Sequence, residues 1–556
     1  MERSNLRKSL AALALAALTA CGGNGAVAGS SGLLPSHRAR SDQDAILTRI
    51  VGVGDSLTAG YQSNGFLGQT GVNNPNYEGN QVPPNQENGF WADLVEQASG
   101  EPIGTAISKM YDPSVSPLPL IKGPGLDNQL TPSSSYYFPF GQMKSGDVCT
   151  DNGGFDLAGF RLKGAPRTRL NPNSTTIRDF GVPGITLHEA NVLHQPQTST
   201  CQELPGIPGL LSQIVSEESG TFWPVLLNYT KLGGHLTEVN AAASVHPTLA
   251  TVWLGANDWL KVMGSGGRFF GGDRTVAQVE TDVRATIQTL EHSGAKVVVA
   301  NLPDILETGL FERVNEIPEH SPQCRIRTYA NCFMNAVGGV PYAAIAQIAK
   351  EYGLATPTGC VPASTTSPCG YIMLPGAVAV IQVLGSTGKV PSLDCVVPAI
   401  PCKVVPGSGQ GMHYITPEFA GKLQALNNII NEGIDDAATA EHVPLVDVHA
   451  IFHGILSGNP NDPYFKLASS IKPGLCCTLG YLWGISSFDG IHPSNTGYAL
   501  IASVFIDTIN KAYGTHIPQI DLEAVYEGKR CGSGPNPHGY YCYPDPYAPP
   551  NDAPYK

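Results

Sequence analysis

The sequence has few charged residues: they make up 14% of its 556 residues, and the formal net charge is −13. Binding to nucleic-acid phosphates requires clustered Lys and Arg, so this balance argues against a nucleic-acid partner. No CxxC pair occurs, and no Cys is matched by a His at zinc spacing, which argues against a metal site. We therefore expect neither a metal ion nor a cofactor.

Long apolar runs are also scarce. Leu10–Ala20 is too short to span a bilayer as a helix, and the apolar stretch 371–384 is short and interrupted by Pro375-Gly376. The first of these runs follows three basic residues and ends in Leu-Thr-Ala-Cys-Gly-Gly, which resembles a bacterial lipobox with Cys21 as the lipidated residue. The alternative is an ordinary cleaved signal peptide that contains an incidental Cys.

We therefore expect residues 1–21 to be a lipoprotein signal peptide and residues 22–44, rich in Gly and Ser, to be a flexible tether. The protein would be exported and anchored to a membrane through Cys21, on the periplasmic or cell-surface face. Gly22 rather than Asp after Cys21 favours the outer membrane.

Cysteine usage agrees with export. Removing Cys21 from the 13 cysteines leaves twelve, an even number that suits disulfides in an oxidising compartment. Several are close in sequence and could staple loops: Cys324/Cys332, Cys360/Cys369, Cys395/Cys402 and Cys531/Cys542. The remaining four have no obvious partner: Cys149, Cys201, Cys476 and Cys477.

Four short apolar runs are continuous rather than alternating, which favours buried parallel strands: 46–53, 248–254, 296–301 and 444–448. Helical patterns separate them. Thr275 and Gln278 form a capping box before a helix that ends near Gly294, Thr416 precedes a helix that reaches about Ala440, and Ser494 caps the last core helix. This order predicts an α/β fold, with a parallel sheet between helix layers.

The predicted core domain spans residues 45–515. Two long Pro- and Gly-rich stretches, near 66–170 and 355–412, are interpreted as insertions that build walls or a lid around a site. The second stretch could instead be a separate small domain. Residues 516–556 form a Pro- and Tyr-rich C-terminal tail.

Chemistry-bearing residues follow the predicted strands. Ser56 lies in Gly54-Asp55-Ser56 after the first strand and before a predicted helix start at residues 57–60, where a hydroxyl can project from the ligand-binding edge of the sheet. In Asp489-Gly490-Ile491-His492, the spacing lets a carboxylate orient an imidazole that can take the Ser56 proton. Asp489 could otherwise simply cap a turn.

Two other histidines are weaker candidates for the base than His492. His413 has no acid three residues before it, and the spacing of Asp447 and His449 is more often structural. For an oxyanion, Asn257 can offer its amide after the second strand, and Phe180–Thr186 supplies a glycine N–H, at Gly184 or alternatively Gly181. The N–H of Ser56 would be the third donor.

Four turns thus carry the candidate residues, and along the chain they hold Ser56, the glycine, Asn257 and the Asp489–His492 pair in that order. This set of turns resembles the SGNH hydrolases, also called the GDSL esterase/lipase family. The resemblance covers roughly residues 45–515 without the insertions, and it maps the family's Ser, Gly, Asn and His onto Ser56, Gly184, Asn257 and His492, with Asp489 as the triad acid. The N-terminus is similar to those of exported bacterial lipoprotein members. The resemblance implies a flavodoxin-like three-layer α/β/α sandwich with about five parallel strands.

The expected function is therefore that of a serine esterase or lipase that hydrolyses carboxylic esters of small molecules or lipids. Two alternatives remain: a carbohydrate O-deacetylase of the same fold, and a surface-anchored binding lipoprotein without catalysis.

Overall fold

The computed structural model divides the chain into two units, Met1–Ser41 and Asp42–Lys556. All described residues belong to the second unit: 45–61, 85–100, 117–119, 176–192, 236–264, 274–308, 311–313, 359–361, 364–373, 414–456, 459–471, 485 and 491–526. The signal peptide, Cys21 and most of the predicted insertions and tail lie outside them.

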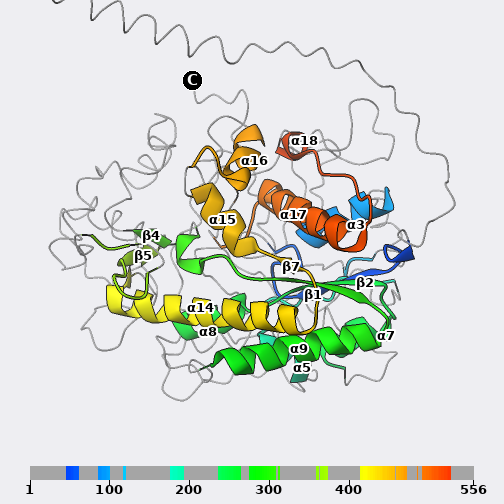
Figure 1. The fold of residues 1–556 in the computed structure, drawn as a ribbon, viewed down its shortest axis with the longest axis horizontal. Helices are drawn as coiled ribbons and strands as arrows, with labels where there is room; N and C mark the ends of the chain where they lie inside the picture. The colour runs from blue at the N-terminus through cyan, green and yellow to red at the C-terminus, as the bar shows by residue number, and fades with distance from the viewer. Residues whose placement is uncertain are drawn as a thin grey trace, which may run out of the picture. The chain divides into compact units, whose positions relative to one another are not determined.

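The main sheet has four parallel strands in the order β1-β2-β3-β7 (Figure 1). The strands are β1 (Ile50–Gly54), β2 (Leu249–Trp253), β3 (Lys296–Ala300) and β7 (Leu445–Val446). The register places Gly54, Trp253, Ala300 and Val446 side by side, so all four carboxyl ends meet at one edge of the sheet.

A fifth stretch runs along the free side of β1. Asp179 forms a parallel bridge with Gly52, and the N–H groups of Phe180 and Val182 donate to the carbonyls of Gly52 and Gly54, both at 2.9 Å. Counted in chain order with this stretch included, the five parallel segments lie in the order 2-1-3-4-5. The family resemblance implies about five parallel strands, and within the described residues the parallel sheet contains four strands plus this bridge.

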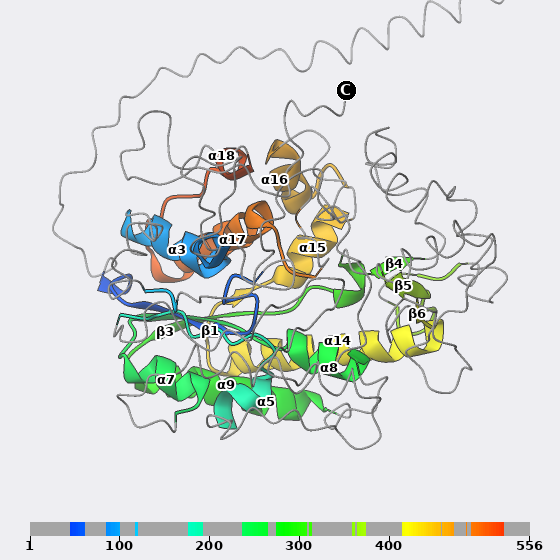
Figure 2. The same ribbon diagram turned by 180° about the vertical axis from the view of Figure 1, so that it is seen from behind.

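Helices cover both faces of the sheet (Figures 1 and 2). One layer contains α3 (Phe90–Ser99), α15 (Val448–Leu456), α16 (Pro463–Ile471), α17 (Asn495–Tyr513) and α18 (Leu522–Tyr526). The other contains α5 (Leu187–Val192), α7 (Glu238–Ser244), α8 (Ala256–Gly264), α9 (Val276–His292) and α14 (Pro417–Ala440). The described residues also contain two 3-10 turns, η2 (Asn85–Asn88) and η6 (Ile305–Glu307). This arrangement confirms the α/β class.

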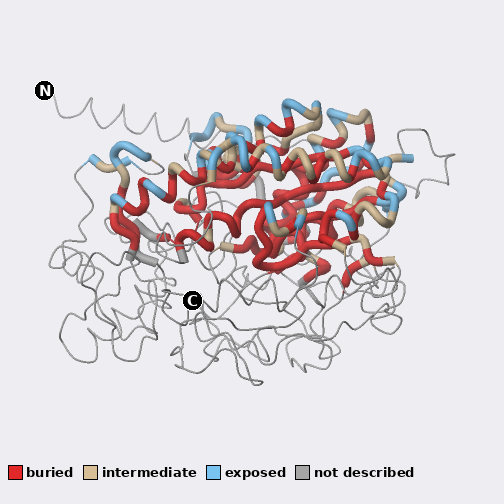
Figure 3. The backbone as a smooth tube through the Cα atoms, turned by 90° about the horizontal axis from the view of Figure 1, so that it is seen from below, coloured by how far each residue is buried: buried red, intermediate tan, exposed pale blue. Residues whose placement is uncertain are grey.

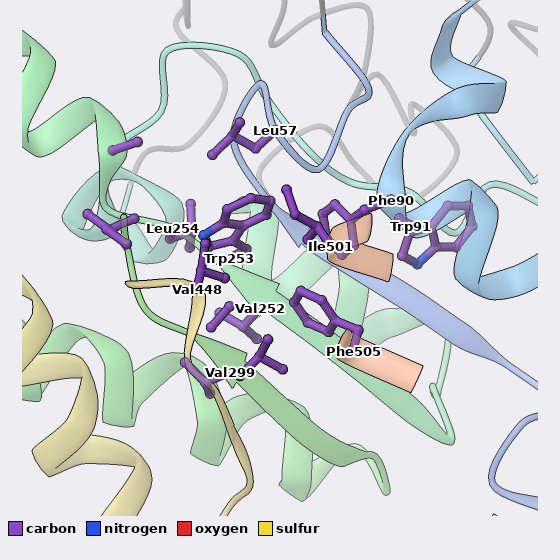
Figure 4. Close-up of a cluster of buried hydrophobic side chains, with 14 of the residues drawn as sticks. Leu57, Phe90, Trp91, Val252, Trp253, Leu254, Val299, Val448, Ile501 and Phe505 are labelled. Carbon is purple, nitrogen blue, oxygen red and sulfur yellow. The ribbon is translucent and has the colours of Figure 1, made fainter. Parts of the chain in front are cut away.

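The core lies between the sheet and these helices, and exposed positions gather on the outer sides of the described elements (Figure 3). On the α3–α17 face, Phe90 and Phe505 stack with ring centroids 4.7 Å apart, and Phe90 meets Trp253 edge-on at 5.3 Å. Leu57, one residue after Ser56, lies in the same buried cluster (Figure 4). Burial of Leu57 helps to fix the backbone of the turn that carries Ser56.

Three of the predicted helix starts, those at Thr275, Thr416 and Ser494, are confirmed. The capping box of Thr275 and Gln278 is present in both directions, and the side chains of Thr416 and Ser494 each accept a backbone N–H at the start of α14 and α17. Strand bounds differ. The first strand begins at Ile50 rather than residue 46, and β7 is cut to two residues because Val448 already begins α15.

A second, antiparallel sheet was not predicted from the sequence. It has the order β4-β5-β6 and consists of β4 (Phe311–Arg313), β5 (Tyr371–Met373) and β6 (Tyr414–Ile415). Just before β5, Cys360 and Cys369 form a disulfide, one of the four close pairs in the sequence. The other cysteines lie outside the described residues. No helix in the described part of the chain has the length and apolar character needed to cross a membrane.

Candidate active site

Ser56 lies two residues beyond the last residue of β1, in a turn. The Asp55 carboxylate accepts the N–H of Leu57 at 3.0 Å, and the carbonyls of Asp55 and Ser56 accept the N–H groups of Ala59 and Tyr61 at 3.1 and 2.9 Å. The helix start predicted at residues 57–60 is therefore wrong, because these residues form a turn that ends at Gly60. The turn brings the Ser56 side chain to the carboxyl edge of the sheet.

His492 meets Ser56 across 436 positions of sequence. Its Nε2 lies 2.7 Å from the Ser56 Oγ, and both side chains are buried. A hydroxyl donates to a neutral imidazole nitrogen in this geometry, which is the contact that a general base requires.

The surroundings of His492 hold the ring in place. Ser494 caps α17 two residues later, and its N–H donates to the Ile485 carbonyl at 2.6 Å. The Tyr61 ring packs against the imidazole at a centroid distance of 4.9 Å, while the Tyr498 hydroxyl donates to the Tyr61 carbonyl at 2.7 Å. The sequence did not predict the contact of Tyr61 with His492. The position of Tyr61, five residues after Ser56, was the only sign that it lies near the site. Asp489, the predicted orienting acid, lies outside the described residues.

Gly184 lies in a tight turn that faces the same edge. The Ile185 N–H donates to the Val182 carbonyl at 3.2 Å, and Gly184 has φ 82°, so Pro183-Gly184 form the centre of a type II turn. Across the described part of the chain, no acceptor binds the N–H of Gly184 or that of Ser56. The N–H of Gly181, in contrast, donates to the Asp179 carboxylate at 3.0 Å. Of the two glycines, Gly184 is the one with a free donor.

Asn257 lies in the first turn of α8, after β2. Its side-chain Nδ2 donates to the Asp55 carboxylate at 3.2 Å and to the Ile185 carbonyl at 3.0 Å. Asn257 thus connects the Ser56 turn to the Gly184 turn. Both amide hydrogens have protein acceptors in this state, so an additional acceptor would have to displace one of them.

Three buried carboxyl groups surround the end of β1. Glu238 accepts the Gly54 N–H at 2.7 Å, and burial, together with the nearby Asp55 and Asp179, raises the pKa of Glu238 well above its ordinary value. Burial raises the pKa of Asp179 to about 8, although its bond from Gly181 opposes this. Asp179 is therefore mainly protonated at neutral pH, which limits the negative charge beside β1.

The other histidine candidates lie elsewhere. His413 is outside the described residues. Asp447 accepts the N–H of Ala450 at 2.9 Å and the Asn301 amide at 3.0 Å, so it supports the start of α15. His449 pairs with Asp304, not with Asp447, at 3.0 Å. The structural interpretation of Asp447 is thus supported, and the Asp304 partner could not be read from local spacing.

The described residues contain no group of three or more His, Cys, Asp or Glu side chains that could hold a metal ion. The geometry instead gathers a hydroxyl, an imidazole and two free backbone donors at one edge. Ser56 follows β1 and Asn257 follows β2, the neighbouring strands at which the order 2-1-3-4-5 reverses direction. Open parallel sheets bind ligands at this switch point, outside the carboxyl ends of the strands.

No family model matches this chain, and no protein in the curated set is found to be similar to it.

Proposed function

We propose that this protein is a serine hydrolase of the SGNH type that cleaves carboxylic esters with Ser56 as nucleophile. The observation that carries the proposal is the 2.7 Å contact between the Ser56 Oγ and the His492 Nε2. A serine hydroxyl is a weak nucleophile at neutral pH, and an imidazole within hydrogen-bond reach is the usual means of activating it. The strand order 2-1-3-4-5, which is that of flavodoxin-like sheets, supports the finer assignment of the fold.

The proposed reaction has two halves. His492 removes the Ser56 proton as Oγ attacks the ester carbonyl, and the protonated imidazole then gives that proton to the leaving alcohol. Water, deprotonated by His492, then attacks the acyl-enzyme. The bond between the acyl carbon and the Ser56 Oγ breaks, the protonated imidazole returns its proton to Oγ, and the acid is released. Asp489, three residues before His492, is proposed to orient the imidazole, as the family resemblance implies.

The oxyanion formed in each half needs donors placed in advance. The free N–H groups of Ser56 and Gly184 support this role, because a buried donor without an acceptor is costly unless a ligand satisfies it. The Asn257 amide would be the third donor once its bond to the Ile185 carbonyl is exchanged for one to the oxyanion. Its bond to Asp55 would persist and hold the amide in place.

A panel of p-nitrophenyl esters, from acetate to long acyl chains, tests the proposal. The wild type should hydrolyse at least one ester and the Ser56→Ala variant none. Ser503→Ala should match the wild type, since Ser503 is a buried serine whose hydroxyl, among the described residues, bonds only the Ala499 carbonyl of its own helix. Wild-type turnover no greater than that of Ser56→Ala on every ester would overturn esterase activity. Parallel assays on acetylated oligosaccharides distinguish an esterase or lipase from a carbohydrate O-deacetylase.

We also propose that the chain is exported and anchored through a lipid on Cys21. The lipobox-like sequence Leu18–Gly23 supports this proposal. Growth of an expressing bacterium with radiolabelled palmitate should label the wild type and leave Cys21→Ser unlabelled. Equal labelling of both proteins would contradict it.

A further inference from the structure

A buried ionic group joins α8 and α9 close to the proposed oxyanion donors. Arg274, just before α9, binds the Asp258 carboxylate through one terminal nitrogen and the Asp282 carboxylate through the other. The Asp258 side chain is 3% exposed and that of Arg274 is 11% exposed. Charges this well buried are costly unless they are paired, so each partner constrains the position of the other.

Asp258 also reaches the segment that follows Gly184. Its second carboxylate oxygen accepts the N–H of Leu187 at 2.8 Å. Its neighbour Asn257 donates to the Ile185 carbonyl at 3.0 Å. Asn257 and Asp258 of α8 therefore bind the Ile185 carbonyl and the Leu187 N–H, respectively. Gly184 directly precedes this doubly bonded segment.

A second ion pair supports the same segment from α8. Lys261 donates to the Glu189 carboxylate at 2.7 Å, and Glu189 in turn accepts the N–H of Thr186 at 2.9 Å. The backbone from Ile185 to Leu187 is thus bonded at three successive residues. Of these bonds, the one from the Leu187 N–H goes to Asp258, whose other carboxylate oxygen binds the buried Arg274.

We propose that Asp258, held by Arg274, is a positioning residue that fixes the Gly184 N–H relative to the Asn257 amide in the proposed oxyanion site. This inference rests on the proposed hydrolase function. Neither side chain touches the reacting atoms. Displacement of a catalytic group by about 1 Å can slow catalysis by roughly 100-fold, so a clamp this close to Gly184 affects rate as well as stability.

Asp282 provides the matched control. It shares Arg274 with Asp258 and also pairs with the exposed His188 at 3.1 Å, but it forms no bond to residues 184–187. A residue that acts only through the stability of the ionic group should therefore behave like Asp282. A positioning residue should differ from Asp282 in turnover.

The experiment compares Asp258→Asn, Asp282→Asn and Arg274→Lys at a temperature well below each unfolding midpoint. Asp258→Asn should lower kcat about 10- to 100-fold with KM within about twofold. Asp282→Asn should keep kcat within about twofold of the wild type. Arg274→Lys should fall between the two, because it keeps the charge without the two-pronged geometry.

A readout that does not depend on turnover accompanies the kinetics. Amide hydrogen exchange of a peptide covering residues 185–190 should accelerate in Asp258→Asn and stay at the wild-type rate in Asp282→Asn. An active wild type whose kcat responds equally to both substitutions, or not at all to Asp258→Asn, would overturn the positioning role. A wild type that hydrolyses no ester would instead show that the proposed function is wrong, and the inference would fail with it.

Discussion

Two histidines lie at the same edge of one parallel sheet, yet their partners differ. His492 contacts the Ser56 hydroxyl near the ends of β1 and β2, and His449 contacts the Asp304 carboxylate near the ends of β3 and β7. In strand order, β7 is three spacings from β1, or about 14 Å. The fold thus places both histidines at the carboxyl edge of the sheet. The side chain that each imidazole contacts determines whether it can take part in proton transfer.

The Asp304 carboxylate has three side-chain partners among the described residues. The Asp304 carboxylate accepts the Gln424 amide at 2.6 Å and the Asn427 amide at 3.2 Å as well as His449. Among the described residues, the His449 ring is hydrogen-bonded to the Asp304 carboxylate, and no hydroxyl or thiol is hydrogen-bonded to it. We conclude that the His449 pair stabilises the packing of α15 against α14, whereas His492 is available for proton transfer.

The largest expected difference between the two regions is in turnover. His492→Ala should lower kcat on the best ester by about 10⁴-fold or more, because the base is lost. His449→Ala should leave kcat within about twofold, because its imidazole lies outside the proposed site. Steady-state kinetics of both variants test this contrast. Equal losses in the two variants would break it.

The asparagines that follow β2 and β3 give a second contrast. Asn257→Ala should slow turnover by about 100-fold, since one of the proposed oxyanion donors is removed. Asn301 binds Asp447 and the His449 N–H, so Asn301→Ala should cost about 1–3 kcal/mol of unfolding free energy with kcat near that of the wild type. Kinetics and urea unfolding check both variants. Normal turnover in Asn257→Ala would remove it from the site.

The buried Asp179 beside β1 should make the stability of the protein depend on pH. Burial raises the pKa of Asp179 from 3.8 to about 8, so its contribution to stability is complete below about pH 4 and is lost as the pH rises to 8. Asp179→Asn retains an acceptor for the Gly181 N–H and cannot ionise. It should therefore be more stable than the wild type at pH 8, by an amount on the order of a few kcal/mol, and similar at pH 4.

Thermal unfolding midpoints at pH 4, 6 and 8 measure this trend. A difference between Asp179→Asn and the wild type that stays constant across the three values would contradict the buried, neutral state of Asp179.

The smallest effect concerns His449. The Asp304 carboxylate raises the pKa of His449 above its ordinary value of 6.5. The pairing therefore adds stability below about pH 6.5 that is lost as the pH rises through the higher, folded-state pKa. His449→Gln should flatten this slope in unfolding midpoints between pH 5 and pH 8 without changing kcat. A retained slope would assign the titration to another group.

The sequence predicted the parts of this molecule that depend on local pattern. Continuous apolar runs marked the strands, and Thr275, Thr416 and Ser494 marked helix starts because capping depends on neighbouring residues. The sequence predicted a helix start after Ser56, where the structure has a turn. Residues 57–60 are held by carbonyls from Asp55 and Ser56 and by burial of Leu57, which a propensity pattern does not show.

The site itself was only partly predictable. The order of predicted strands and helices along the chain was enough to place Ser56 and Asn257 after strands and His492 before a helix. It also identified Gly184 and Gly181 as the two candidate glycines. That Gly181 uses its N–H on Asp179 while Gly184 keeps its own free depends on contacts between distant segments. The same holds for Arg274 between Asp258 and Asp282, and for Asp304 beside His449.

Covalent labelling tests the central claim most directly. A fluorophosphonate ester reacts with an activated serine and reports on the nucleophile without requiring the natural substrate. Peptide mass spectrometry should place the label on Ser56 in the wild type and in His449→Ala, and should find almost none in His492→Ala. Absence of label on Ser56 in the folded wild type, or equal labelling in His492→Ala, would contradict the account.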